Sequence, residues 1–194
     1  MDQILLFFIS SLALTLMPGP DILFVINQSL EDKKSGFLVA LGLCSGLVIH
    51  TLIIAFGVSS LIEQNDFMID FFKYFGTSYL FYLAFLEVKK NNKLNKTRKE
   101  NFYLRGVYMN LINPKVLLFF LAYFPNFLFS NTISTSNQFI ILGAIFILQA
   151  LIVFSIVSLL SNRLTSILKV DAKNKKIVYL KSFIFVLIGL SILF

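Results

Sequence analysis

An acidic residue follows a pair of prolines inside an apolar stretch near the start of the chain. The run "TLMPGPDILF" places Pro18, Gly19 and Pro20 directly before Asp21, with almost only apolar residues on either side. Each proline removes a backbone N–H donor and clashes with the preceding helical turn. Two prolines and a glycine in three residues therefore predict an opened helix. Its new N-terminal end suits a carboxylate, and its freed carbonyl oxygens, with Asp21, suit an ammonium group.

A second break of the same kind lies in the other half of the chain. In "NLINPKVLLF", Asn113 and Pro114 come directly before Lys115. Each half thus carries a proline break followed by one ionisable residue, and the two residues have opposite charge. A kink that serves packing alone is the alternative interpretation, and a single proline fits it better than the Pro-Gly-Pro run does.

The composition predicts that helices in a membrane position these residues. Of the 194 residues, 57% are hydrophobic and 14% are charged, whereas soluble domains have about 45–50% apolar and about 25% charged residues. This excess indicates one integral membrane domain over residues 1–194, without a separate soluble domain. With Cys44 as the only cysteine and one histidine in the chain, no internal disulfide, metal site or cofactor is expected.

Six apolar segments are long enough to cross a bilayer, for which a helix needs about 20 residues. They span residues 3–30, 36–62, 67–88, 106–129, 138–160 and 177–194. The sequence therefore predicts an all-α membrane protein with six transmembrane helices, of which the first and the fourth are broken. Residues 1–88 form the predicted first set of three, and residues 106–194 form the second.

The basic residues gather in alternate loops. Lys33 and Lys34 follow the first span, seven Lys and Arg residues lie in the loop 89–105, and five lie between the fifth and sixth spans. Since basic loops stay in the cytoplasm, both termini are predicted to face outward. The net charge of +7 then belongs to the surface of a lipid bilayer, and a nucleic-acid partner is not expected.

The two sets of three spans run in opposite directions, as in the 3+3 inverted repeats common among transporters. Asp21 lies ten residues before Glu31, and Lys115 lies ten residues after Arg105. At 1.5 Å per residue, both are about 15 Å from the cytoplasmic ends of their spans. An isolated charge at that depth costs at least about 2.5–3.5 kcal/mol. We therefore expect Asp21 and Lys115 to face one interior cavity, close enough to pair directly or through water.

A second group of polar residues lies within the other predicted spans. His50 titrates near neutral pH, so it is a candidate for proton coupling, with a hydrogen-bonded interior histidine as the alternative. Gln149 and Asn110 are candidates for lining a polar path, with bonding between helices as the alternative. Gly42 and Gly46 form a G-x-x-x-G pattern, which predicts the close approach of another helix.

Taken together, these motifs resemble those of the lysine exporter and homoserine/threonine resistance (LysE/RhtB) family of bacterial amino-acid exporters. The similar stretches come in the family's order and cover most of the chain: "LTLMPGPDILFVINQSL", "GFLVALGLCSGLVIH", "FGTSYLFYLAFLEV" and "GVYMNLINPKVLLFFLAYFPNFL". The resemblance implies a secondary transporter of the bacterial inner membrane that exports amino acids or related small metabolites. It would be driven by H⁺ or Na⁺, with the proton expected first. It places residues 18–21 and 113–115 at the family's motif positions. One departure is Ala84, where the family usually has glycine.

Other classes of function remain as alternatives. An exporter of other metabolites and a passive channel share the same expected fold. A membrane oxidoreductase with two facing cysteines is excluded by the lone Cys44. Hydrolase or transferase chemistry needs clustered His, Asp, Arg or Ser near an interface, so no catalytic residue is predicted. The identity of the cargo and the formation of a homo-oligomer are left open.

Overall fold

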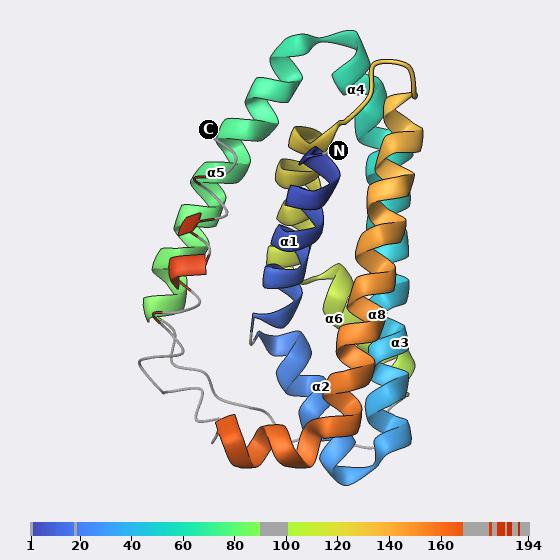
Figure 1. The fold of residues 1–194 in the computed structure, drawn as a ribbon, viewed down its shortest axis with the longest axis vertical. Helices are drawn as coiled ribbons and strands as arrows, with labels where there is room; N and C mark the ends of the chain where they lie inside the picture. Colours follow the sequence, from blue (N-terminus) through green and yellow to red (C-terminus); the bar gives the residue numbers. More distant parts are fainter. Residues whose placement is uncertain are drawn as a thin grey trace.

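The computed structural model describes residues 2–17, 19–89 and 101–168, together with residues 179, 182–184, 186–187 and 190. Every element of the described residues is helical (Figure 1). The elements in chain order are α1 (Asp2–Leu16), α2 (Pro20–Glu31), α3 (Lys33–Ile53), the π-helical η1 (Ile54–Val58), α4 (Ser59–Gln64), α5 (Asp66–Lys89), α6 (Phe102–Leu111), α7 (Pro114–Leu118), the π-helical η2 (Phe119–Tyr123), the 3₁₀-helical η3 (Phe124–Phe127) and α8 (Thr135–Leu168). Pro18, most of the basic loop 89–105 and most of the sixth predicted span lie outside the described residues.

Within the described residues, two stretches of helix are long and apolar enough to cross a membrane without a break, at Lys33–Glu63 and Thr135–Arg163. The helices on either side of the Pro-Gly-Pro run would form a third span as a pair bent by 54°. These stretches correspond to the predicted second, fifth and first spans. The third predicted span is the single helix α5, and the fourth is divided among α6, α7, η2 and η3. The six-span inverted repeat as a whole stays a prediction.

Both predicted helix breaks are present. Gly19 has an extended backbone (φ −117°, ψ −174°) and Pro20 opens α2 as its first helical residue, a position where proline's missing N–H costs nothing. At the second break α6 ends at Leu111, Asn113 is extended (φ −73°, ψ 106°), and Pro114 opens α7. Local proline sterics thus end one helix and begin the next at each site.

The tight α2–α3 junction depends on Asp32. This residue separates the two helices, and its side chain accepts hydrogen bonds from the backbone N–H groups of Lys34 and Ser35 at 3.2 and 2.9 Å. The side-chain and backbone hydrogen bonds from Ser35 hold the pKa of the Asp32 carboxyl below its usual value. A carboxylate at this place satisfies N–H groups that an α-helix leaves unpaired at its start.

The helix α3 packs against α2, α6 and α8, and α5 packs against η2 and η3. Figure 1 shows α3 and α8 running side by side, with α1 above α2 in the centre and α5 leaning outward. The start of α1 and the α4–α5 turn lie at one end of the bundle. The α2–α3 junction, with Lys33 and Lys34, lies with the end of α8 at the other.

The G-x-x-x-G pattern is used for packing, as predicted. A Cβ atom on Gly42 would collide with the backbone carbonyl oxygen of Tyr103 and lie 3.0 Å from the Cα atom of Gly106. A Cβ on Gly46 would lie 2.6 Å from Oδ1 of Asn110. The backbones of α3 and α6 therefore approach as closely as glycine allows.

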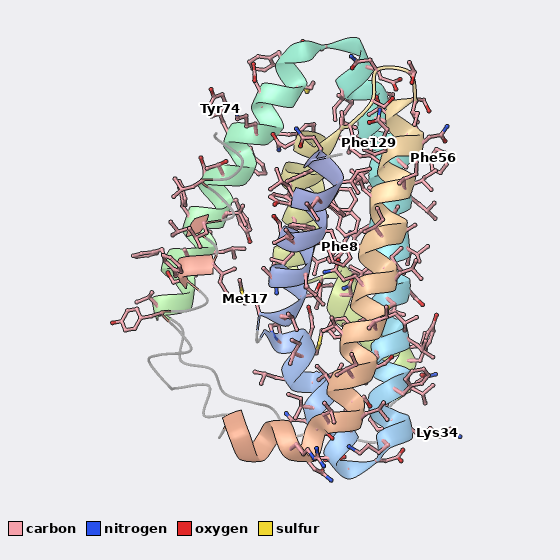
Figure 2. The ribbon with its side chains drawn as sticks, in the orientation of Figure 1. Phe8, Met17, Lys34, Phe56, Tyr74 and Phe129 are labelled. Carbon is pink, nitrogen blue, oxygen red and sulfur yellow. The ribbon has the colours of Figure 1, made fainter. Side chains whose placement is uncertain are left out.

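Aromatic rings fill the interior beside the second break. The ring centroids of Phe120 and Phe124 are 4.3 Å apart, those of Phe119 and Tyr123 are 4.6 Å apart, and Phe7 of α1 meets Phe124 edge to face at 5.1 Å. By contrast, large apolar side chains such as Phe56 (68% exposed) and Tyr74 (61%) point away from the bundle (Figure 2). An apolar exterior around a buried aromatic interior fits a helix bundle surrounded by lipid.

Candidate functional site

The two helix breaks meet in the interior. The side-chain amide nitrogen of Asn113 donates hydrogen bonds to both carboxylate oxygens of Asp21, at 3.0 and 2.9 Å. Asp21 and Asn113 are each 6% exposed. The side-chain oxygen of Asn113 accepts a hydrogen bond from the backbone N–H of Lys115 at 3.1 Å. One asparagine therefore fixes the acid of the first break to the start of the helix behind the second.

The ammonium group of Lys115 lies against the first break. It donates a hydrogen bond to the backbone carbonyl of Leu14 at 3.0 Å. In an unbroken helix that carbonyl would accept from the N–H of residue 18, but residue 18 is a proline and has no N–H. A Cβ on Gly19 would lie 3.6 Å from the Lys115 nitrogen. The carbonyl that Pro18 frees is thus taken by the lysine of the other half of the chain.

Asp21 and Lys115 line the same small cavity. Its volume is about 20 Å³, counted as space for the centres of water molecules. Its lining includes these described residues: Leu14, Thr15, Met17, Asp21, Ile22, Leu47, Asn110, Lys115, Val116, Phe146, Ala150 and Phe154. A buried water needs about 10–15 Å³ of such space. The cavity therefore has room for about one water and is far too small for an amino acid.

Comparison with known proteins identifies the family of this chain. A family model described as LysE type translocator matches residues 12–194. The chain belongs to the LysE type translocator family. The matched residues include both helix breaks and the described residues that line the cavity. The resemblance found in the sequence motifs is thereby confirmed.

This translocator is similar to bacterial efflux proteins. The chain is 27% identical over 146 residues to proteins named leucine efflux protein from Salmonella choleraesuis (strain SC-B67) and Salmonella paratyphi A (strain ATCC 9150 / SARB42). The matched region covers 71% of this chain and 68% of each relative. No solved structure matches this translocator.

The structure places His50 beside the second break but outside the cavity lining. Nε2 of His50 lies 3.4 Å from the backbone carbonyl oxygen of Asn110, and its ring stacks on Phe120 with 5.4 Å between centroids. Pro114 removes the N–H that this carbonyl would meet in an unbroken helix. The carbonyl instead accepts from the N–H of Asn113 at 3.1 Å. This placement supports the interior hydrogen-bonded alternative for His50.

Asn110 belongs to the cavity, whereas Gln149 belongs to a different site. Among the described residues, Oδ1 of Asn110 has no hydrogen-bond partner, and its residue lines the cavity. Oε1 of Gln149 accepts from the hydroxyl of Ser11 at 2.9 Å, joining α8 to α1. Gln149 also lines an apolar groove of about 620 Å³ between these helices, separate from the cavity. Bonding between helices is thus the interpretation that the structure favours for Gln149.

Of the described lining residues, sequence reasoning identified only Asp21, Asn110 and Lys115. Thr15 lies one turn before the first break, and its hydroxyl donates to the backbone carbonyl of Ser11 at 2.8 Å. Phe146, Ala150 and Phe154 come from α8. Their spacing of four residues, which places them on one helix face, is the signal that could have identified them. No cluster of three or more metal-binding side chains occurs in the described part of the chain.

Proposed function

We propose that this translocator exports amino acids and binds them as zwitterions between its two helix breaks. The observation that carries the proposal is that one carboxylate and one ammonium, Asp21 and Lys115, line a single small cavity. The ammonium of a bound amino acid would lie at Asp21. Its carboxylate would lie at Lys115 and the N-terminal end of α2, where the helix dipole favours negative charge. The similarity to the two Salmonella leucine efflux proteins supports amino-acid export as the activity.

In this proposal the structure corresponds to a closed state. A cavity of about 20 Å³ cannot hold the cargo, so the site opens first to one side of the membrane and then to the other. Alternating access of this kind is typical of proteins in which broken helices surround a central site. The proposed location is the bacterial inner membrane, with both termini outside.

We also infer that export is coupled to an ion gradient, with the proton as first candidate and Na⁺ as second. Asp21 and Lys115 are the charged side chains among the described lining residues. A proton that exchanges at this pair would change the charge that the cargo meets. A sodium ion would need oxygen ligands, which Asp21 and the freed carbonyl oxygens of the breaks could supply.

The test is transport by purified protein in liposomes. Labelled amino acids are offered under an imposed proton gradient, an imposed sodium gradient, or neither. We expect saturable, gradient-dependent transport of at least one amino acid, and a decrease of about tenfold or more in Asp21→Asn and Lys115→Ala. Lys34→Ala, at an exposed position at the end of the bundle, should transport like the parent.

Three outcomes would contradict parts of the proposal. Intact protein that moves no amino acid would remove the function. Flux without saturation or a gradient would favour a passive channel. If Asp21→Asn and Lys115→Ala both transport like the parent, the site is wrong although the function can stand.

A further inference from the structure

The central cavity is chemically divided. Its charged groups, Asp21 and Lys115, come from the two helix breaks. Its contribution from α8 is wholly apolar and consists of Phe146, Ala150 and Phe154. Residues four apart lie one above another on a helix, so these three form a continuous strip along α8.

All three residues of this strip are buried. Ala150 is 1% exposed, and the two phenylalanines are 4% and 5% exposed. Alanine is the smallest side chain of the strip, and it lies one turn from a large ring in each direction. A group that enters the cavity toward α8 would therefore find the most room beside Ala150.

The division of the cavity restricts the cargo. Asp21 and Lys115 are matched by the ammonium and carboxylate that every amino acid carries. A further charge on the cargo's side chain would lie against apolar groups without a partner, which is costly in a buried site. An apolar side chain would instead bury its surface against the strip.

We propose, on the basis of the proposed amino-acid export, that the α8 strip Phe146–Ala150–Phe154 holds the side chain of the cargo. The substrate class is neutral amino acids with apolar side chains, and Ala150 sets the largest side chain that the site admits. The cavity widens around this strip when the site opens. The strip determines specificity, whereas the helix breaks bind the part common to all amino acids.

The experiment measures a ratio rather than a rate. Parent, Ala150→Leu and Ala150→Gly are reconstituted in liposomes, and the transport of labelled leucine and labelled alanine is compared. Leucine, phenylalanine, lysine and glutamate serve as unlabelled competitors. Apolar pockets discriminate a single methylene by about 10–200-fold. We therefore expect Ala150→Leu to shift the ratio of leucine transport to alanine transport at least tenfold toward alanine. In Ala150→Gly, unlabelled phenylalanine should inhibit the transport of labelled leucine more strongly than it does in the parent.

Ala144→Leu is the matched control because Ala144 lies on the same helix but is exposed. The leucine-to-alanine ratio of this variant should equal that of the parent.

The proposal is overturned if lysine or glutamate competes as well as leucine, or if the leucine-to-alanine ratio is unchanged in both Ala150 variants. Equal loss of leucine and alanine transport in Ala150→Leu, with no change in Ala150→Gly, also contradicts it. A parent that transports no amino acid overturns the proposed function together with this inference, whereas an active parent with an unchanged ratio overturns this inference alone.

Discussion

Asn113 uses both ends of its side-chain amide at the meeting of the two helix breaks. Its oxygen accepts from the backbone N–H of Lys115 and so caps α7. Its nitrogen donates to both oxygens of Asp21. Asp21 is buried, and a buried carboxylate without hydrogen bonds is costly. Asn113 therefore stabilises the acid and also fixes its position relative to Lys115.

Replacing Asn113 with alanine should affect transport and stability together. We expect transport in liposomes to fall by about tenfold or more, because Asp21 loses the donor that positions it. The free energy of unfolding should fall by about 1–3 kcal/mol, since a buried acceptor loses its partner and α7 loses its cap. Thermal unfolding in detergent, followed by the loss of monodisperse protein, measures the second effect.

Asn101→Ala provides a control of the same chemical type. Oδ1 of Asn101 caps α6 by accepting from the N–H of Leu104 at 3.2 Å, but the residue is exposed. This variant should lose about 1 kcal/mol of stability and transport like the parent. If Asn113→Ala behaved in the same way, the asparagine would be a helix cap and nothing more.

The residue pattern predicted the breaks, but it did not predict the partners of their freed carbonyls. Proline at positions 18 and 114 removes the N–H groups that Leu14 and Asn110 would meet in a continuous helix. Those carbonyls face Lys115 and His50, each from the opposite half of the chain. The effect of a proline is local and readable from the sequence. The partner of a freed carbonyl depends on which helices pack together, which the sequence does not state.

At the scale of elements, the contact between α3 and α6 positions part of the cavity lining. Gly42 of α3 faces Gly106 of α6, and Gly46 faces the side chain of Asn110. This close approach places Leu47 and Asn110 together in the cavity. A small-residue pattern on one helix thus determines the position of a polar group on another.

A methyl group at Gly42 should separate these helices. The new Cβ would collide with a backbone carbonyl and the Cα of Gly106, and backbone atoms cannot turn aside as a side chain would. We expect Gly42→Ala to reduce the free energy of unfolding by about 1–3 kcal/mol, the typical cost of an overpacked core. Thermal unfolding in detergent measures the difference. Gly57→Ala is the control because a Cβ there meets nothing within 4 Å. If Gly42→Ala were as stable as Gly57→Ala, the packing argument would be refuted.

Element types were less predictable than element positions. The predicted span 106–129 is one apolar run in the sequence, yet the structure divides it into α6, α7, η2 and η3. The π-helical η2 carries Phe119, Phe120 and Tyr123, which are buried among other rings. π-Helical turns occur as short insertions, frequently at functional sites. Whether a turn closes as an α- or a π-helix is decided by such tertiary packing, so apolar periodicity alone could not foresee it.

On the scale of the whole molecule, α8 is tied to the first half of the chain on both sides of the cavity. On one side the hydroxyl of Ser29 donates to that of Ser158 at 2.8 Å, and the ammonium of Lys33 donates to the carbonyl of Ser158 at 2.9 Å. On the other side the hydroxyls of Ser59 and Ser136 lie 2.9 Å apart. The cavity-lining residues of α8 lie between these ties, near the middle of the long helix in Figure 1. In the proposed transport cycle, one of these ties separates before cargo enters or leaves along α8.

A disulfide across one tie should therefore stop transport. In a Cys44→Ser background, Ser29→Cys and Ser158→Cys would place two sulfur atoms close to the bonding distance of about 2.0 Å, since the hydroxyl oxygens are already 2.8 Å apart. We expect an oxidant to reduce liposome transport to background and a reducing agent to restore it. Ser59→Cys with Ser136→Cys should give the same result at the opposite end, whereas each single-cysteine variant should be insensitive to the oxidant. The cavity in this structure is too small for the cargo, so it must open somewhere during transport. If fully crosslinked protein transported at the parent's rate, α8 would stay tied throughout the cycle. The cavity would then open between other helices.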